Sequence, residues 1–150
     1  MGALLEVVIA FFTEDNWNFH HEAEGSTIRL RFQGDQHVWD CAALVLEEQD
    51  QLVFYSVCPV NTPEPLRHSV GEYLTRVNWG LAVGNFELDL EDGQARFKTS
   101  IDVEGDRLSF ALVRRLVYTN VLTMNRYLPG LLNVIAGRAS PRQALAEVEG

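Results

Sequence analysis

The feature that most constrains the fold is a pair of alternating segments on either side of Asp92-Gly93. Residues 86–91 alternate between apolar and acidic side chains, and in residues 95–101 the mainly apolar set Ala95, Phe97, Thr99 and Ile101 alternates with polar residues. Such alternation is typical of half-buried strands, and Asp-Gly between them favours a two-residue type I′ turn. In that register the facing pairs are Asp89 with Arg96, Glu87 with Lys98, Leu88 with Phe97, and Leu90 with Ala95. Opposite charges then meet on one face and apolar groups on the other, which predicts an antiparallel hairpin stabilised by about 0.2–1 kcal/mol per pair.

Further strands are expected in the first half of the chain. Residues 28–32 alternate between apolar side chains and arginines, and residues 19–22 are expected to pair with them across Glu24-Gly25-Ser26. Residues 38–46 and 52–57 are apolar on both faces. Runs of this kind suit strands in the middle of a sheet that is covered on each side.

Helical periodicity is found at the start, in the middle and in the last third of the chain. Apolar residues follow helical spacing over residues 5–12, over residues 66–81 and over residues 108–135. Thr62 is expected to cap the second helix, with Pro63 in its first turn and Gly80 at its end. Pro129 predicts a kink or break of the third helix near Leu128.

The C-terminal segment carries its own helix signal. Gly137 is expected to end the third helix, and Ser140 to Gln143 reads as a capping box with Pro141 in the first turn. A short helix should then run to about Val148. All these elements predict one α+β domain over residues 1–150: a helix, a meander of strands, a helix, a hairpin, and one or two helices.

The two cysteines allow a test of strand register. With a tight turn at Gln49-Asp50, Cys41 would face Cys58 as a non-hydrogen-bonded pair, near the short end of what a disulfide spans. A cytosolic chain keeps such thiols reduced, which favours two small buried thiols over a bridge. Both alternatives stay open at this point.

Charge limits the kinds of partner. The chain of 150 residues has a formal net charge of −9, and residues 1–62 hold ten acids and two bases, a net charge of −8. An acid excess argues against nucleic acid and anionic membranes as partners. The acidic part is a solvated face that keeps the chain soluble or a docking surface for a basic partner. We find no secretory signal and no apolar run long enough for a membrane helix, so a cytoplasmic location is expected.

Residue patterns for catalysis or metal binding are lacking in the sequence. The four histidines form no HExxH or HxH motif, the serines lie outside a GxSxG context, and the glycines form neither a GxGxxG fingerprint nor a P-loop. We therefore expect no catalytic residues, no cofactor and no metal. Asp89, Glu91 and Asp92 are explained by their place on the charged face of the hairpin.

The third helix contains three turns without a charge, between Arg115 and Arg126. A surface helix of a monomer needs a solvated face, so burial by a second subunit would explain this segment. The alternative is a core helix with a few neutral polar groups facing water. The residues expected to mediate self-association are Leu116, Val117, Asn120, Val121 and Met124.

The order of these motifs resembles the YbjN-type family of bacterial sensory transduction regulators. The resemblance covers about residues 65–145 and rests on Tyr73, Leu74, Asn78, Gly80-Leu81, Gly84-Asn85-Phe86-Glu87, Asp92-Gly93, Arg96-Phe97, Tyr127, Pro129, Leu132 and residues 137–144. It implies a type III secretion chaperone-like fold, in which helices pack on an antiparallel sheet. Proteins with this fold are often dimeric. It brings no catalytic residues, and the regulatory label does not itself establish function.

The sequence and the resemblance together favour a non-enzymatic module that binds another protein through apolar grooves or a sheet edge, as a homodimer. The identity of that protein is not indicated. The alternative is a small-molecule-binding or hydrolytic domain with a pocket between sheet and helices. A deep pocket with converging polar groups would favour the alternative, whereas a flat apolar patch would favour the binding module. A purely structural subunit of a larger assembly fits the same residues.

Overall fold

A computed structural model describes residues 2–22 and 25–150. Twelve elements follow one another along the chain: α1 (Ala3–Glu14), β1 (Phe19–His21), β2 (Thr27–Gln33), β3 (Val38–Leu46), a 3-10 turn (Glu47–Gln49), β4 (Gln51–Val57), a second 3-10 turn (Glu64–Leu66), α2 (Arg67–Trp79), β5 (Asn85–Leu88), β6 (Ala95–Asp102), α3 (Phe110–Ile135) and α4 (Pro141–Glu149). No helix in this part of the chain is long and apolar enough to cross a membrane.

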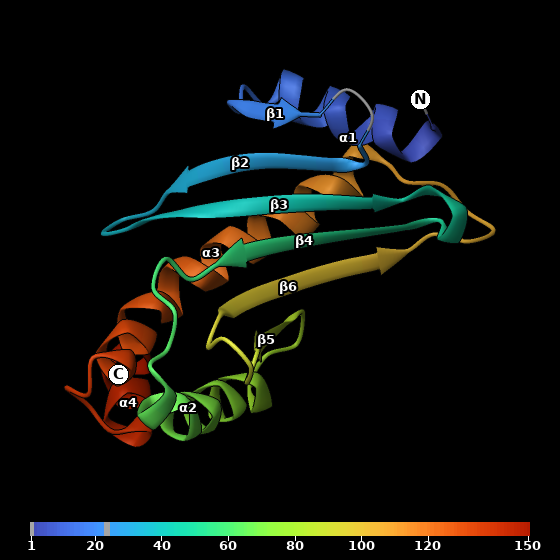
Figure 1. The fold of residues 1–150 in the computed structure, drawn as a ribbon. Helices are drawn as coiled ribbons and strands as arrows, with labels where there is room; N and C mark the ends of the chain where they lie inside the picture. Colours follow the sequence, from blue (N-terminus) through green and yellow to red (C-terminus); the bar gives the residue numbers. More distant parts are fainter. Residues whose placement is uncertain (1, 23–24) are drawn as a thin grey trace.

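The six strands form one antiparallel sheet in the order β1-β2-β3-β4-β6-β5 (Figure 1). The predicted pairing of residues 19–22 with residues 28–32 is confirmed, although Glu24 of the predicted turn lies outside the described residues. The predicted α+β class is confirmed as well. The long strands β3 and β4 lie at the centre of the sheet, as their apolar sequences indicated.

The helices pack on one face of this sheet. In Figure 1, α3 runs behind β3 and β4, with α1 near one end of it and α2 and α4 near the other. Phe12 of α1 stacks against Phe54 of β4, and the buried Asn120 of α3 donates to the Phe54 carbonyl. The expectation that β3 and β4 are covered on both sides is therefore wrong for the single chain, because the described helices cover only one side.

The N-terminus of α1 is capped from a distant part of the chain. Gly2 offers no side chain to the first turn, and the carboxylate of Glu47 accepts the N–H groups of Leu4 at 3.2 Å and Leu5 at 2.9 Å instead. A carboxylate at this position also interacts favourably with the helix dipole. The turn after β3 thereby holds α1 against the sheet.

The hairpin of β5 and β6 forms, but its predicted register is wrong by two residues. Glu87 faces Arg96 and Leu88 faces Ala95, so β5 ends at Leu88 and Asp89 begins a longer loop. The Asp89 N–H donates to the Gln94 carbonyl, which closes a wider loop than a two-residue turn. Side chains of two aspartates in the loop accept backbone N–H groups at 2.8 and 2.9 Å, which stabilises this form. Since the shift is even, the residues within β5 and β6 keep their predicted faces. Leu90, predicted to face Ala95, instead lies in the loop and is 71% exposed.

The register of β3 and β4 also differs from the prediction by two residues. A 3-10 turn followed by Asp50 in the left-handed region (φ 55°) replaces the tight turn, and Cys41 faces Ser56. Cys41 and Cys58 are both buried and both are free thiols. The unbridged alternative is therefore confirmed, and the expected facing of the two cysteines is wrong.

The second helix begins differently from the prediction and ends as predicted. Thr62 caps nothing with its side chain: a 3-10 turn precedes α2, and the buried Thr62 Oγ1 has no hydrogen-bond partner. The Thr62 N–H instead donates to the Gly93 carbonyl at 2.7 Å, so this residue ties the loop before α2 to the hairpin loop. Gly80 lies at the C-terminal end of α2, as expected.

The last two helices follow their sequence signals closely. Ser140 and Gln143 form the predicted capping box of α4, and Gly137 adopts φ 71° just after α3. However, α3 continues through Pro129 to Ile135, so the break near Leu128 does not occur. Tyr73 of α2 donates its hydroxyl to the Tyr127 carbonyl at 2.8 Å, and this contact secures the end of the helix that contains the proline.

Candidate protein-binding surfaces

The five residues proposed for self-association are covered by their own chain. Leu116, Val117, Asn120, Val121 and Met124 are each at most 7% exposed and pack on the inner face of the sheet. Their burial within one chain favours the alternative of a core helix over cover by a second subunit. The uncharged part of α3 is a core helix whose outer side presents neutral residues, among them Leu122 at 58% exposure.

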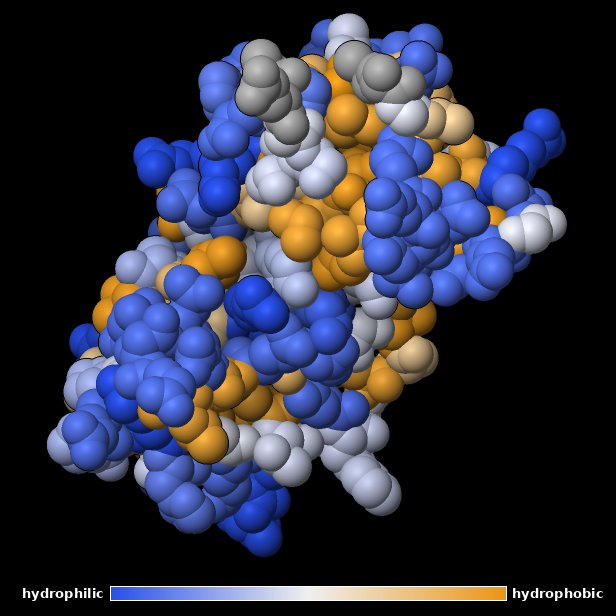
Figure 2. Space-filling model, turned by 45° about the vertical axis from the view of Figure 1, so that its right-hand side comes forward, coloured by the Kyte–Doolittle hydropathy of each residue, from blue (hydrophilic) through white to orange (hydrophobic). Residues whose placement is uncertain are grey.

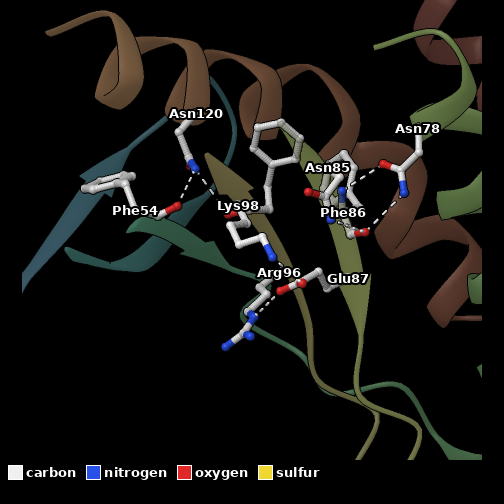
Figure 3. Close-up of polar contacts among 9 residues, drawn as sticks. Phe54, Asn78, Asn85, Phe86, Glu87, Arg96, Lys98 and Asn120 are labelled. Atoms are coloured by element: carbon white, nitrogen blue, oxygen red, sulfur yellow. Dashed lines mark hydrogen bonds and ion pairs between the residues drawn. The ribbon is translucent and has the colours of Figure 1, made fainter. Parts of the chain in front are cut away.

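Asn120 shows why this helix carries a polar residue in the core. Its Nδ2 lies 2.9 Å from the Phe54 carbonyl, 3.2 Å from the Phe97 carbonyl and 3.2 Å from Thr99 Oγ1, as Figure 3 shows in part. The Thr99 hydroxyl in turn donates to the carbonyl of Leu116 at 2.9 Å. The amide thus connects α3 to β4 and β6 and sets the position of the helix on the sheet.

None of the described helices lies over the opposite face of the sheet. Its central residues are apolar and point outward from β3 and β4, and we call them the open sheet face: Ala42, Leu44, Leu46, Val53, Tyr55 and Val57. All six are partly exposed. This side of the molecule is seen obliquely in Figure 2, where hydrophobic side chains gather in the upper half of the view beside hydrophilic ones.

Charged groups lie on both sides of the open sheet face. On the β2 side Arg31 pairs with Asp40 at 3.0 Å. On the β6 side Glu87 binds Arg96 and Lys98, each at 2.8 Å, in an arrangement visible in Figure 3.

Of the two bases on the β6 side, Arg96 also interacts with the ring of Tyr55, and both lower the pKa of Glu87. The Arg96 guanidinium lies 4.0 Å from the centre of the Tyr55 ring. Partial burial tends to raise the pKa of Glu87, but hydrogen bonds and charge from Lys98 and Arg96 outweigh it, and the pKa is lowered. The carboxylate therefore stays ionised.

The β5 edge of the sheet is closed by a side chain. Asn78 donates its Nδ2 to the Phe86 carbonyl at 3.1 Å and accepts the Phe86 N–H at 2.8 Å, the two contacts drawn in Figure 3. An unpaired edge strand is a template for another strand, and here the amide occupies both backbone groups. The expectation that a partner adds at a sheet edge is not supported at β5.

The residue after Asn78 has the most exposed aromatic side chain on the described surface. Trp79, the last residue of α2, is 94% exposed, and Val83 in the following loop is 56% exposed. No charged residue occurs between Arg76 and Glu87. The sequence analysis missed the exposed Trp79. The uncharged stretch of residues 77–86, which contains this tryptophan together with Gly80, Ala82 and Gly84, could have indicated it.

Metal sites and activated thiols can be assessed in the described residues. Within residues 2–22 and 25–150, no three His, Cys, Asp or Glu side chains are placed to hold a metal ion. Desolvation by burial raises the pKa of the Cys41 thiol to about 12 and that of Cys58 to about 11, so neither is an activated nucleophile.

Five hollows on the described surface have volumes of about 220–510 Å³. One of about 400 Å³ lies between the β2–β3 turn, α3 and α4. Its Asn125 and Asp35 already hydrogen-bond to each other. Another, of about 510 Å³, lies beside Val57 at one end of the open sheet face.

The family model described as a putative bacterial sensory transduction regulator matches residues 4–133. The chain belongs to the YbjN family. The resemblance stated from the sequence is thereby confirmed, and the match includes the first 60 residues. None of the curated proteins compared with the chain matches it.

Two solved structures place this YbjN-family chain among known folds. The crystal structure of YbjN, a putative transcription regulator from E. coli, has a TM-score of 0.66 at 11% identity, over 83% of this chain and 87% of that one. A structure of the ExsC-ExsE complex has a TM-score of 0.54 at 14% identity, over 85% of this chain and 97% of that one. The expected type III secretion chaperone-like fold is confirmed.

Proposed function

We propose that this YbjN-family chain is a non-enzymatic regulatory module of the cytoplasm that acts by binding another protein. We further propose that residues 1–150 form one domain and that it works as a homodimer. The family description is that of a regulator, and one similar fold was solved as a complex of two proteins, ExsC and ExsE. Both support the proposal at the level of fold and family.

The observation that carries the partner-binding part is the exposed Trp79. An indole that is 94% in solvent forgoes the stabilisation that burial of a large apolar side chain provides, about 1.5–3 kcal/mol. The backbone next to it is held in place, since the side chain of Asn78 is bonded twice to the backbone of Phe86. Tryptophan is enriched among residues that dominate binding energy, and a backbone segment that is already ordered loses little further entropy on binding. We therefore propose that Trp79 enters an apolar pocket of the protein partner.

The small-molecule or hydrolytic alternative lacks a comparable observation. Such sites combine an enclosed apolar cavity with a few polar groups that converge in it. In the hollow of about 400 Å³, Asp35 and Asn125 are hydrogen-bonded to each other, and the buried thiols have raised pKa values.

The test is site-specific cross-linking in the organism that encodes the chain. A photoreactive phenylalanine analogue replaces Trp79, and in the control it replaces Leu90, which is 71% exposed in the hairpin loop. We expect one protein to cross-link from position 79 and not from position 90. That protein, once purified, should bind Trp79→Ala about 30-fold or more weakly than the wild type, the effect of a hot-spot residue.

Equal binding of the wild type and Trp79→Ala would overturn the role of the indole. The proposed function fails if position 79 captures no specific protein while a metabolite raises the melting temperature of the purified chain.

A further inference from the structure

The open sheet face breaks the alternation expected of a sheet with one solvated side. β2 and β6 obey the rule, because their outward residues include Arg29, Arg31, Arg96 and Lys98. β3 and β4 carry apolar residues outward as well as inward. Antiparallel sheets with one face in water normally place polar residues there. Two central strands with apolar side chains on both faces therefore require a second cover, and the helices in the described part of the chain supply only one.

The charge distribution indicates what supplies the second cover. The outward charged residues of the six strands are Arg29, Arg31, Arg96 and Lys98 against Asp40, Glu87 and Asp102. Their net charge is +1. Since the whole chain has a formal charge of −9, the rest of it carries −10. Nearly all of this negative charge belongs to residues 1–62, so two copies of the chain would repel each other through that acidic part, but they would not repel through the open sheet face.

The signs of the charges also suit contact between identical surfaces. A twofold contact joins a patch to itself, so a border that offers both a base and an acid can pair with either border of the second copy. The β2 border has Arg31 with Asp40, and the β6 border has Glu87 with Arg96 and Lys98. A partner of one charge sign would meet like charges on each border. The surface is thus apolar in the centre and self-complementary at its edges.

We propose that the open sheet face packs against the same face of a second copy of this chain. The inference rests on the homodimer of the proposed function and names its surface. Trp79 stays outside this contact, at the C-terminal end of α2, and remains available to the protein partner.

Mass measurement of the purified full chain tests this directly. Leu44 and Val53 face each other across β3 and β4 at the centre of the patch. In Leu44→Glu and in Val53→Glu each copy would bury an unpaired carboxylate, so we expect the dimer dissociation constant to rise at least about 100-fold. Light scattering should give twice 16.9 kDa for the wild type and 16.9 kDa for both variants at the same concentration. Circular dichroism checks that the fold is kept, and the milder Leu44→Ser serves if Leu44→Glu fails to fold.

The matched control is Leu122→Glu, which makes the same change at an exposed leucine on the outer side of α3. We expect it to remain a dimer. A dimer that survives Leu44→Glu and Val53→Glu overturns the assignment of the surface while the homodimer stands, and loss of the dimer in Leu122→Glu alone would place the contact on α3 instead. A wild type that is monomeric at micromolar concentration overturns both this inference and the homodimer, whereas the partner-binding part is judged separately by the cross-linking at position 79.

Discussion

Replacement of Asn120 by alanine separates its role in the core from a role in self-association. The side chain is fully buried, and its Nδ2 lies within 3.2 Å of three oxygens on β4 and β6. Its Oδ1 has no hydrogen-bond partner. Alanine removes the link between α3 and the two strands without adding volume. In an interface residue the same change would weaken the dimer and leave unfolding of the protomer unchanged.

The size of the effect follows from three contributions. Nδ2 carries two protons, so two hydrogen bonds are lost, at about 1 kcal/mol each. A cavity of about one or two water volumes adds about 0.7–1.4 kcal/mol. Removal of the unpartnered Oδ1 returns about 1 kcal/mol of desolvation cost. We expect the free energy of unfolding to fall by about 2 kcal/mol, within a range of about 1–4 kcal/mol.

Urea unfolding followed by circular dichroism measures this quantity, at two protein concentrations so that dissociation of a dimer is recognised. The matched control is Asn125→Ala on the same helix, whose amide bonds Asp35 at the surface, and it should cost less than about 1 kcal/mol. Asn120→Asp is a sharper variant, because its carboxylate would face three oxygens in a buried site.

Burial would raise the pKa of that aspartate in the folded state above its unfolded value of about 3.9. The stability of Asn120→Asp should therefore be greatest in acid and fall as the pH rises through the folded pKa. The reasoning is refuted if Asn120→Ala costs no more than Asn125→Ala, or if Asn120→Asp loses no stability on going from acid to neutral pH.

Three further predictions concern the turn before β4, the thiols and the end of α1. Glu47→Ala should lower the free energy of unfolding by about 0.5–2 kcal/mol, because the first turn of α1 loses its acceptor, whereas the exposed Glu48→Ala should change it by less than about 0.5 kcal/mol; equal effects in urea unfolding would contradict the capping role. Burial raises the pKa values of Cys41 and Cys58 to about 12 and 11, so a thiol reagent at mildly alkaline pH should titrate neither in the folded chain and both after denaturation without reductant; fewer than two thiols in the denatured chain would indicate a bridge. Hydrogen bonds from a tyrosine and a tryptophan lower the pKa of Asp15, so its contribution to stability is present above the unfolded pKa of about 3.9 and is lost as the pH falls through the folded pKa; the stability difference between the wild type and Asp15→Asn should shrink on acidification, and a constant difference would count against this.

Much of the local structure could be predicted from the sequence, because it depends on neighbours along the chain. The capping box of Ser140, the glycine after α3 and the alternation of β5 and β6 are each set by residues a few positions apart. The cap of α1 could not be predicted in this way. Its carboxylate belongs to Glu47, more than 40 residues from the N–H groups that it binds.

The candidate surfaces show the same division. The apolar character of β3 and β4 on both faces indicated that two covers are needed, and the uncharged part of α3 indicated a buried helix. Only the folded chain shows that α3 is buried by its own sheet while the outer face of that sheet stays open. The sequence analysis assigned the missing cover to the wrong element, since a pattern tells how much of an element is buried and not which neighbour buries it.

By itself the sequence determined which residues form strands and helices, and which face of each strand is apolar. The tertiary structure decided the registers of both mispredicted hairpins, the continuity of α3 through Pro129 and the side of the sheet that the helices cover. The physical reason is the two-residue period of a strand: a shift of two leaves every side chain on its face, so alternation cannot distinguish the two registers. Loop hydrogen bonds and contacts between distant segments make that choice, and these exist only once the chain has folded.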